Sequence, residues 1–229
     1  MRFAVMQPYL FPYLGYYQLV HAVDEFVFYD DVTYIKGGYI NRNNILCNGR
    51  SQRFTIPVIG MSSNKYIKDL NFDVNISKVL KTLEQAYRKA PFFELIFPIV
   101  HDVLSDDERN ISHVTSRSIS EIFKYLGSLK KFYYSSDLNY DREQSAADKL
   151  ISISSCLKSK EYINSPGGKG LYDKEYFSNQ GIKLNFIEVE DHAYRQGIDD
   201  FVPNLSIIDV LMWNDKEEVI TLLDKYRLV

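Results

Sequence analysis

The pattern of hydrophobic and polar residues predicts that the chain opens with a strand, a turn, a helix and a second strand. Residues 3–6 are apolar and favour a short buried strand. Pro12 stands where a helix can begin, and apolar residues over 14–23 then give one rough helical face. Residues 25–29 are aromatic and β-branched, which is typical of a strand. This order predicts the start of a parallel α/β unit.

The middle of the chain changes from polar loops to helices. Residues 34–50 are rich in Gly and Asn and predict a loop, with a hairpin into the run 53–59, and residues 61–69 predict a further exposed loop. Residues 75–126 then predict three helical segments. Apolar residues between 76 and 87 share one helical face, Pro91 begins the next segment, and the third ends at Gly127.

Strands and helices alternate again after residue 130. Residues 131–134, 162–164 and 182–189 predict strands, residues 143–157 and 173–179 predict helices, and the tail from Leu205 is mostly helical. The chain shows no internal repeat and no obvious linker. We therefore predict a single domain over residues 1–229. Its fold class is α/β, with a Rossmann-like, mostly parallel sheet and a helical insertion around residues 75–126.

Composition narrows the class of protein. A hydrophobic fraction of 45% supports a substantial core, and a net charge of −3 argues against a general nucleic-acid binder. The first residues do not resemble a secretory signal, and no apolar run approaches the roughly 20 residues that cross a bilayer. Cys47 and Cys156 form no CxxC motif and are interpreted as reduced thiols. These features predict a cytoplasmic protein with no membrane span.

The distribution of tyrosines points to the turn after the first strand. Seven of the 18 tyrosines fall within the first 39 residues. The segment 7–18 joins the first strand to the first helix, where nucleotide-binding α/β folds place phosphates. It is neither GxGxxG nor a Walker loop, but Gly15 would let a ligand approach closely. The alternative is an aromatic core packed around a Pro-kinked turn.

Polar residues follow several of the predicted strands. Gln7 follows the first strand, Asp30 and Asp31 follow the second, and residues 135–137 follow a later one. Ligands of open parallel sheets bind at this carboxyl edge. Either aspartate can act as a general base or bind a ribose or an amine, whereas alternation along the strand makes a shared proton improbable. The alternative is ordinary turn chemistry.

The glycine-rich loop at 165–170 offers backbone N–H groups and one cation, Lys169, to an anion. We place three cations near an anionic substrate: Lys36, Arg42 and Lys169. The alternative for each is a solvated surface charge. Asn204 or Ser206 caps the final helical region, and the polar run 194–196 before it can face a pocket.

The sequence gives little support for a metal site or for a catalytic Ser-His-Asp triad. The histidines at 21, 101, 113 and 192 lack metal-ligand spacing, and no HxxxH or CxxC motif occurs, so we predict no metal site. A Ser-His-Asp triad stays open, but the chain has no nucleophile elbow.

Several motifs together resemble the WbqC-like family, and the resemblance covers essentially the whole chain. They are Met6-Gln-Pro-Tyr-Leu-Phe-Pro-Tyr-Leu-Gly-Tyr-Tyr-Gln-Leu-Val-His21, Phe28-Tyr-Asp-Asp31, Tyr34-Ile-Lys36, Asn41-Arg-Asn43, Asn164-Ser-Pro-Gly-Gly-Lys169, Tyr194-Arg-Gln196 and Phe201-Val-Pro-Asn-Leu-Ser-Ile-Ile-Asp209. The family occurs in bacterial surface-polysaccharide gene clusters, including those for O-antigen and capsule. The resemblance implies a glycine transferase, which attaches an amino acid to a sugar.

A more distant likeness concerns ATP. The strand, Pro-rich turn and helix resemble the ATP-binding turn of nucleotidylyltransferases, pantothenate synthetase and class I aminoacyl-tRNA synthetases, which carry His-x-Gly-His. This chain has Tyr13-Leu-Gly-Tyr16 there, so both imidazoles are missing. ATP is therefore a candidate cofactor by resemblance only, and fold likeness does not fix function.

Three functions remain open at this point. The first is a transferase or ligase that attaches glycine or another small acyl group to an amino sugar, which is nucleotide-linked. The second is a glycosyl- or nucleotidyltransferase of the same pathway, and the third is a non-catalytic nucleotide-sugar-binding protein. The partners are small molecules, namely an amino sugar and glycine or an activated acyl donor. The donor, the acceptor and the oligomeric state stay open.

The predicted site residues divide into two groups. The catalytic candidates are Asp30, Asp31 and Lys36. The substrate-binding candidates are Gln7, Tyr9, Tyr13, Gly15, Tyr16, Tyr34, Asn41, Arg42, Asn43, Ser165, Gly167, Gly168, Lys169, Gln196, Asn204 and Ser206.

Overall fold

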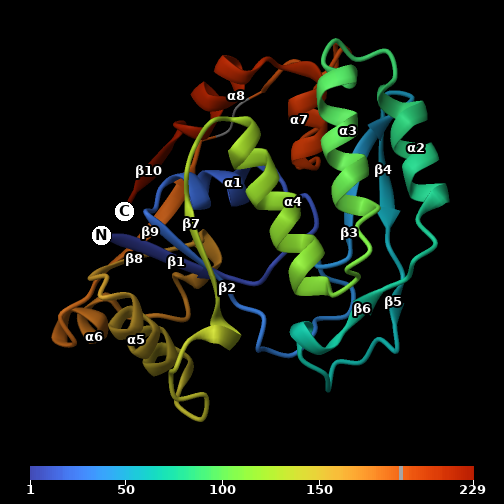
Figure 1. The fold of residues 1–229 in the computed structure, drawn as a ribbon. Coiled ribbons are helices and arrows are strands. Elements are labelled where there is room, and N and C mark those ends of the chain that lie inside the picture. The colour runs from blue at the N-terminus through green and yellow to red at the C-terminus, as the bar shows by residue number, and fades with distance from the viewer. Residues whose placement is uncertain (191–192) are drawn as a thin grey trace.

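A six-stranded sheet forms the centre of the computed structural model, which describes residues 1–190 and 193–229 (Figure 1). Its spatial order is β10-β9-β8-β1-β2-β7, and only the β9–β10 pair is antiparallel. The strands are β1 (Arg2–Met6), β2 (Glu25–Phe28), β7 (Lys131–Tyr134), β8 (Glu161–Asn164), β9 (Lys183–Val189) and β10 (Tyr226–Leu228). The expected α/β fold with a mostly parallel sheet is confirmed.

Apolar side chains cover both faces of the sheet. Phe3, Val5 and Val27 belong to one core, and Ala4 and Phe26 belong to the other. Strands that are buried on both faces are typical of parallel sheets with helices on each side. This explains why the first two strands lack a polar alternation.

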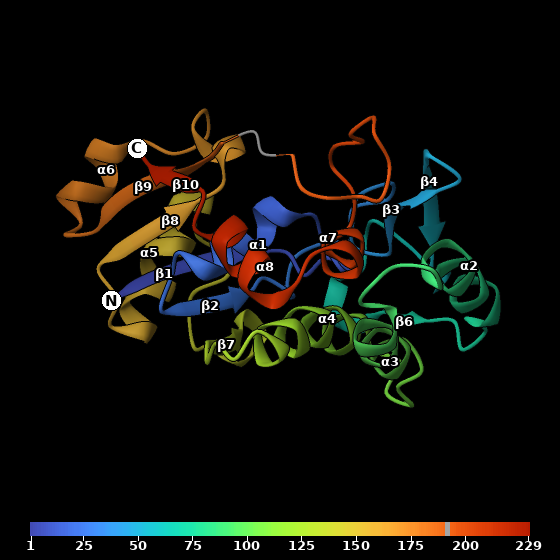
Figure 2. The same cartoon turned by 90° about the horizontal axis from the view of Figure 1, so that it is seen from above.

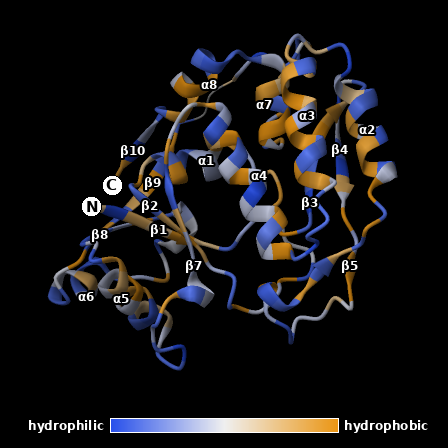
Figure 3. Cartoon of the chain, in the orientation of Figure 1, coloured by the Kyte–Doolittle hydropathy of each residue, from blue (hydrophilic) through white to orange (hydrophobic). Residues whose placement is uncertain are grey.

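Helices cover the two faces in separate groups. The core with Phe26 also contains α1 (Leu14–His21), α4 (Ile111–Tyr125), α7 (Ile207–Trp213) and α8 (Lys216–Leu223). The other core contains α5 (Ala146–Leu157) and α6 (Lys174–Asn179). Figure 1 shows α5 and α6 on one side of the strands and α1, α4 and α8 on the other. Hydrophobic residues dominate α3 and α7 in Figure 3.

The connection from β2 to β7 contains the inserted structure. Two short antiparallel pairs come first: β3 (Arg42–Cys47) with β4 (Arg50–Thr55), and β5 (Val58–Ile59) with β6 (Asn71–Phe72). Helices α2 (Ser77–Tyr87) and α3 (Phe93–Leu104) follow, and α4 returns along the sheet. The predicted helices of residues 75–126 are confirmed.

Two sequence-based expectations were wrong in part. Residues 42–47 form β3 rather than loop, and the hairpin turns at Asn48 and Gly49, whose φ angles are 51° and 72°. An Asn-Gly pair in this conformation is the usual two-residue hairpin turn, but the polar side chains of β3 hide its alternation. The tail contains α7 and α8 as expected, and adds the strand β10.

The strand order determines where a ligand can bind. Numbered by their order in the chain, the five parallel strands lie 3-2-1-4-5, so the order reverses between β1 and β8. Rossmann-like sheets bind ligands outside the carboxyl ends of the strands at this reversal. Among the described residues, no helix is long and apolar enough to cross a membrane.

Candidate ligand-binding site

A cavity of about 750 Å³ lies at the carboxyl edge of the sheet, beside the reversal between β1 and β8. Its wall combines the end of β1, the start of α1, the turn after β8, the end of β9 and the segment before α7. The lining residues are Met6, Tyr9, Tyr13, Leu14, Gly15, Tyr16, Leu19, Ser165, Pro166, Ile187, Val189, Glu190, Ala193, Tyr194, Phe201, Pro203, Asn204 and Leu205. The volume suits a small-molecule ligand.

The turn between β1 and α1 is fixed from three directions at Phe11. The Phe11 backbone has a φ of 40°, and its N–H donates to Ser118 Oγ over 3.0 Å. Its carbonyl accepts from Asn43 Nδ2 at 2.8 Å and from Ser206 Oγ at 2.6 Å. These bonds tie the backbone of the turn to β3, α4 and the start of α7.

Three predicted tyrosines meet at this cavity. Tyr16 is buried, and its hydroxyl donates to the Gln7 carbonyl at 2.9 Å. Burial raises the pKa of Tyr16 well above its usual value. Tyr9 packs 5.6 Å from the Tyr16 ring, and Tyr13 is 38% exposed. Tyrosine presents a flat apolar ring with a polar tip, so the group offers both stacking faces and hydroxyls. The Gln7 side chain is not part of the wall.

Helix α1 begins at the cavity. Its N-cap residue, Tyr13, makes no side-chain capping bond, and the first turn carries no acidic residue. Gly15 lies in that turn, where a Cβ would come within 2.7 Å of the Tyr13 ring and 3.4 Å of Val189. The positive end of a helix dipole favours an anionic group. This end of the cavity therefore suits a phosphate or a carboxylate.

The glycine-rich turn after β8 contributes one polar residue to the cavity. Ser165 lines the wall, whereas Gly167, Gly168 and Lys169 do not. The Lys169 ammonium forms an ion pair with Glu188, which also pairs with Arg227 at 2.7 Å. The cation expected to hold an anion is thus engaged at the outer part of the sheet.

A methyl group at Gly168 is expected to destabilise this turn. The Cβ of an alanine at Gly168 would collide with Nδ2 of Asn164, whereas no atom lies within 4 Å of a Cβ at Gly170. We expect Gly168→Ala to lower the unfolding free energy by about 1–3 kcal/mol, which is the usual cost of overpacking. Urea unfolding of both variants measures the difference, and an equal loss in Gly170→Ala would contradict the steric explanation.

Asp30 and Asp31 lie at the carboxyl end of β2 and outside the cavity lining. Both accept from the Ser135 hydroxyl, which bonds Asp30 at 3.1 Å. Asp31 also accepts from Tyr140 Oη at 2.9 Å and pairs with Arg142 at 2.7 Å. Burial raises the pKa of Asp30. The bonds join the ends of β2 and β7, which lie beyond β1 from the cavity.

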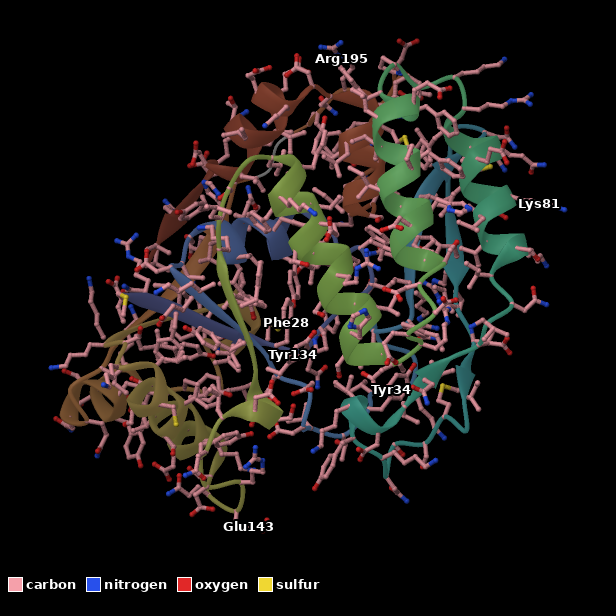
Figure 4. All side chains as sticks on the ribbon, in the orientation of Figure 1. Phe28, Tyr34, Lys81, Tyr134, Glu143 and Arg195 are labelled. Carbon is pink, nitrogen blue, oxygen red and sulfur yellow. The ribbon has the colours of Figure 1, made fainter. Side chains whose placement is uncertain are left out.

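The same edge is visible in Figure 4, where Phe28 and Tyr134 lie side by side. Their rings are 5.8 Å apart at the ends of β2 and β7. Tyr34 lies farther out, toward β5 and β6 (Figure 4). The structure therefore separates the β2–β7 cluster from the cavity at β1, β8 and β9.

The residues predicted between 34 and 43 bond to one another and to the backbone. Tyr34 Oη donates to Asn41 Oδ1 at 2.9 Å, and Asn41 Nδ2 donates to the Ile56 carbonyl at 2.8 Å. Arg42 Nε donates to the Gly38 carbonyl at 3.0 Å. Asn43 supports the opening turn, and Lys36 is exposed outside the cavity lining.

The segment before α7 separates into lining and supporting residues. Asn204, with a φ of 59°, lines the cavity. Ser206 is buried and caps α7 by accepting from the Ile208 N–H at 3.3 Å, which confirms the expected cap. Gln196 is also buried, and it bonds to Val202 and Asp209 rather than to the cavity.

Glu190 and Phe201 are among the lining residues that the predicted site residues did not include. Glu190 follows β9, and the rule applied to the other strand ends would have found it. Phe201 packs at 5.2 Å and 87° on Tyr194, which belongs to the polar run expected to face a pocket. His192 lies outside the described residues.

Charge in the described wall is sparse. Glu190 is its one carboxylate, and the lining residues identified there include neither Lys nor Arg. Within residues 1–190 and 193–229, no group of three or more His, Cys, Asp or Glu could hold a metal ion. The cavity can stack a ring, bind an anion at α1, and bind or deprotonate an amine at Glu190.

The fold is that of an α/β protein with a mostly parallel sheet, and its cavity at the reversal of strand order is the candidate ligand site. Within this class, the chain belongs to the WbqC-like protein family, which matches residues 7–221. A relative from Mycobacterium tuberculosis (strain ATCC 25618 / H37Rv), named "Uncharacterized protein Rv1507c", is 27% identical over 215 residues. The alignment covers 92% of each chain. No solved structure gave a significant match.

Proposed function

We propose that the protein is an enzyme that attaches glycine or another small acyl group to a nucleotide-linked amino sugar. The observation that carries this proposal is the tyrosine-lined cavity at the switch point, with a helix N-terminus and Glu190 in its wall. The WbqC-like resemblance, which implies surface-polysaccharide biosynthesis, supports the same substrate class.

The cavity offers a place for each part of such a substrate. Tyr9, Tyr13 and Tyr16 supply faces on which a base or sugar ring stacks, and the hydroxyls of Tyr9 and Tyr13 can bond sugar oxygens. The start of α1 suits the phosphates, because its N–H groups carry partial positive charge. Glu190 suits the neutral amino group, because its carboxylate can accept a hydrogen bond from the amine and orient the nitrogen as a nucleophile.

The proposed step forms an amide bond. The neutral amine attacks the carbonyl carbon of an activated acyl donor, and the new N–C bond forms as the bond from carbon to the leaving group breaks. The leaving group departs with the bonding electrons, and Glu190 accepts the proton that the nitrogen loses. Tyr13 and Tyr16 stand where the distantly similar ATP-binding turns carry imidazoles, and Tyr16 Oη donates to the Gln7 carbonyl. We therefore derive no step through ATP.

Binding and transfer can be measured separately. We expect UDP-glucosamine to bind in titration calorimetry and to gain one acyl group, by mass, when incubated with an activated glycine donor. Loss of both signals across a panel of UDP-linked amino sugars would contradict the proposal. Manganese-dependent release of a nucleoside diphosphate would instead indicate a glycosyltransferase.

A second function, binding without catalysis, is favoured by the sparse chemistry of the described wall. Its lining contains one carboxylate and no cysteine, lysine or arginine. Binding of UDP-glucosamine that raises the melting temperature, with no turnover by any donor, would support this function through ligand linkage.

A further inference from the structure

One carboxylate beside the cavity has no cationic partner among the described residues. Asp209, in the first turn of α7, has no exposed surface. It accepts from Tyr87 Oη at 2.9 Å, from Tyr194 Oη at 3.0 Å and from Gln196 Nε2 at 3.1 Å. Burying a carboxylate among neutral donors is costly, so its position calls for an explanation beyond packing.

Two of the three donors come from the segment that forms one wall of the cavity. We call residues 194–203 the strap. Tyr194, Phe201 and Pro203 of the strap line the cavity, and the Tyr194 hydroxyl is held by Asp209. Figure 2 shows this orange segment returning from the sheet toward α7. The Tyr194 ring therefore faces the cavity while its tip is bound in the protein interior.

Gln196 links Asp209 to a second part of the strap. Its Nε2 donates to the Val202 carbonyl at 2.8 Å, and its Oε1 accepts from the Val202 N–H at 2.8 Å. The two bonds close the loop that carries Phe201, and the same Nε2 bonds Asp209. One carboxylate thus fixes both aromatic residues that the strap gives to the cavity wall.

The strap also rests on the single tryptophan of the chain. Gly197 has a φ of 67°, and a Cβ at this position would collide with the ring of Trp213. Asn214 bonds both the N–H and the carbonyl of Arg195, at 3.2 and 3.0 Å. Trp213 fluorescence therefore reports whether the strap lies against α7.

We propose that Asp209 is a positioning residue that holds the strap, and with it Tyr194 and Phe201, in the geometry that binds the ligand. The part of this inference that concerns the ligand rests on the proposed function of the cavity. The part that concerns the strap does not, because the hydrogen bonds to Asp209 come from residues of this chain alone.

The chain offers a matched pair of hydroxyls to test this role. Tyr87 and Tyr194 bond the same carboxylate at nearly the same distance, but Tyr87 is buried in α2 and does not line the cavity. The Tyr87 hydroxyl also accepts from the Leu46 N–H at 3.1 Å, so it belongs to the core. Tyr87→Phe is therefore a control for lost stability, and Tyr194→Phe and Asp209→Asn test the strap.

The first experiment needs no ligand and measures amide hydrogen exchange of the full chain at neutral pH. We expect Asp209→Asn to speed exchange over residues 194–203 by about tenfold, without an equal change in β1, and to shift Trp213 emission to the red. Tyr87→Phe should leave both strap signals at the wild-type level. Uniform acceleration along the chain in Asp209→Asn would overturn the proposal, because it would make Asp209 a general stabilising residue.

The second experiment measures binding of UDP-glucosamine by the same variants. We expect Tyr194→Phe and Asp209→Asn to weaken its affinity about tenfold and Tyr87→Phe to leave it within about twofold. Equal weakening by Tyr87→Phe would overturn the positioning role. If the wild type binds no nucleotide sugar, the proposed function fails, while the exchange experiment still decides whether Asp209 holds the strap.

Discussion

Replacing Glu190 with glutamine is expected to lower kcat/KM for acyl transfer by about 100- to 10,000-fold, the usual contribution of a general base. Glu190 is the one carboxylate found in the described cavity wall, and glutamine keeps its size but cannot accept the amine proton. Because glutamine can still bond a sugar hydroxyl, the loss should fall on kcat more than on KM. Steady-state rates with a fixed acyl donor measure both constants.

Glu188 provides the matched control two residues earlier. Its carboxylate pairs with Lys169 and Arg227 and is not part of the cavity wall. Glu188→Gln should change kcat/KM by less than about threefold, since exposed ion pairs contribute little. Similar losses in both variants would point to a damaged β9 strand, and full activity of Glu190→Gln would remove Glu190 from the mechanism.

The stability of the wild type is expected to fall by about 2 kcal/mol relative to Asp209→Asn as the pH rises from about 4 to about 7. Burial raises the pKa of Asp209 to about 6, against the opposing bonds from Tyr87, Tyr194 and Gln196. A carboxyl with a raised pKa binds its proton more tightly in the folded state. Its contribution is therefore fully present below the unfolded pKa of 3.8 and is lost as the pH rises through about 6.

Urea unfolding of both proteins across this range measures the difference. The range starts at about pH 4 so that both proteins stay above the pH at which the contribution of Asp106, which they share, is lost. A bond from the Glu108 N–H is the largest cause that lowers the pKa of Asp106 to about 2, so its stabilising contribution is lost only below that range. A constant difference between wild type and Asp209→Asn from pH 4 to 7 would show that Asp209 does not titrate as proposed.

Much of the sheet could be predicted because its strands are short apolar runs between turn residues. Residues 3–6, 25–29 and 131–134 were placed correctly within one or two positions. The hairpin strand β3 was missed because its polar side chains show no alternation along the chain. The strand that pairs with β3 is β4, which follows the Asn48-Gly49 turn. This Asn-Gly pair was the local sequence signal for a hairpin.

The sequence could predict only those residues of the candidate site whose position follows from the order of strands and helices along the chain. Tyr9, Tyr13 and Tyr16 reach the cavity because a turn that leaves β1 for α1 must pass the carboxyl edge. Asp30 and Asp31 were expected near the cavity because they follow a strand and so lie at the carboxyl edge of the sheet, and they do follow β2. The cavity, however, lies on the β8 and β9 side of β1, and spatial strand order is set by tertiary packing rather than by any local pattern.

The position of β1 has a consequence for how the molecule assembles. Arg2 of β1 pairs with Glu161 of β8, 159 residues later in the chain. Closing so long a loop costs conformational entropy before any contact compensates for it, and such nonlocal pairing slows folding. During synthesis the opening turn must wait while β8, β9 and the strap are made. We therefore expect the candidate site, which needs β8, β9 and the strap, to be among the last parts of the fold to form.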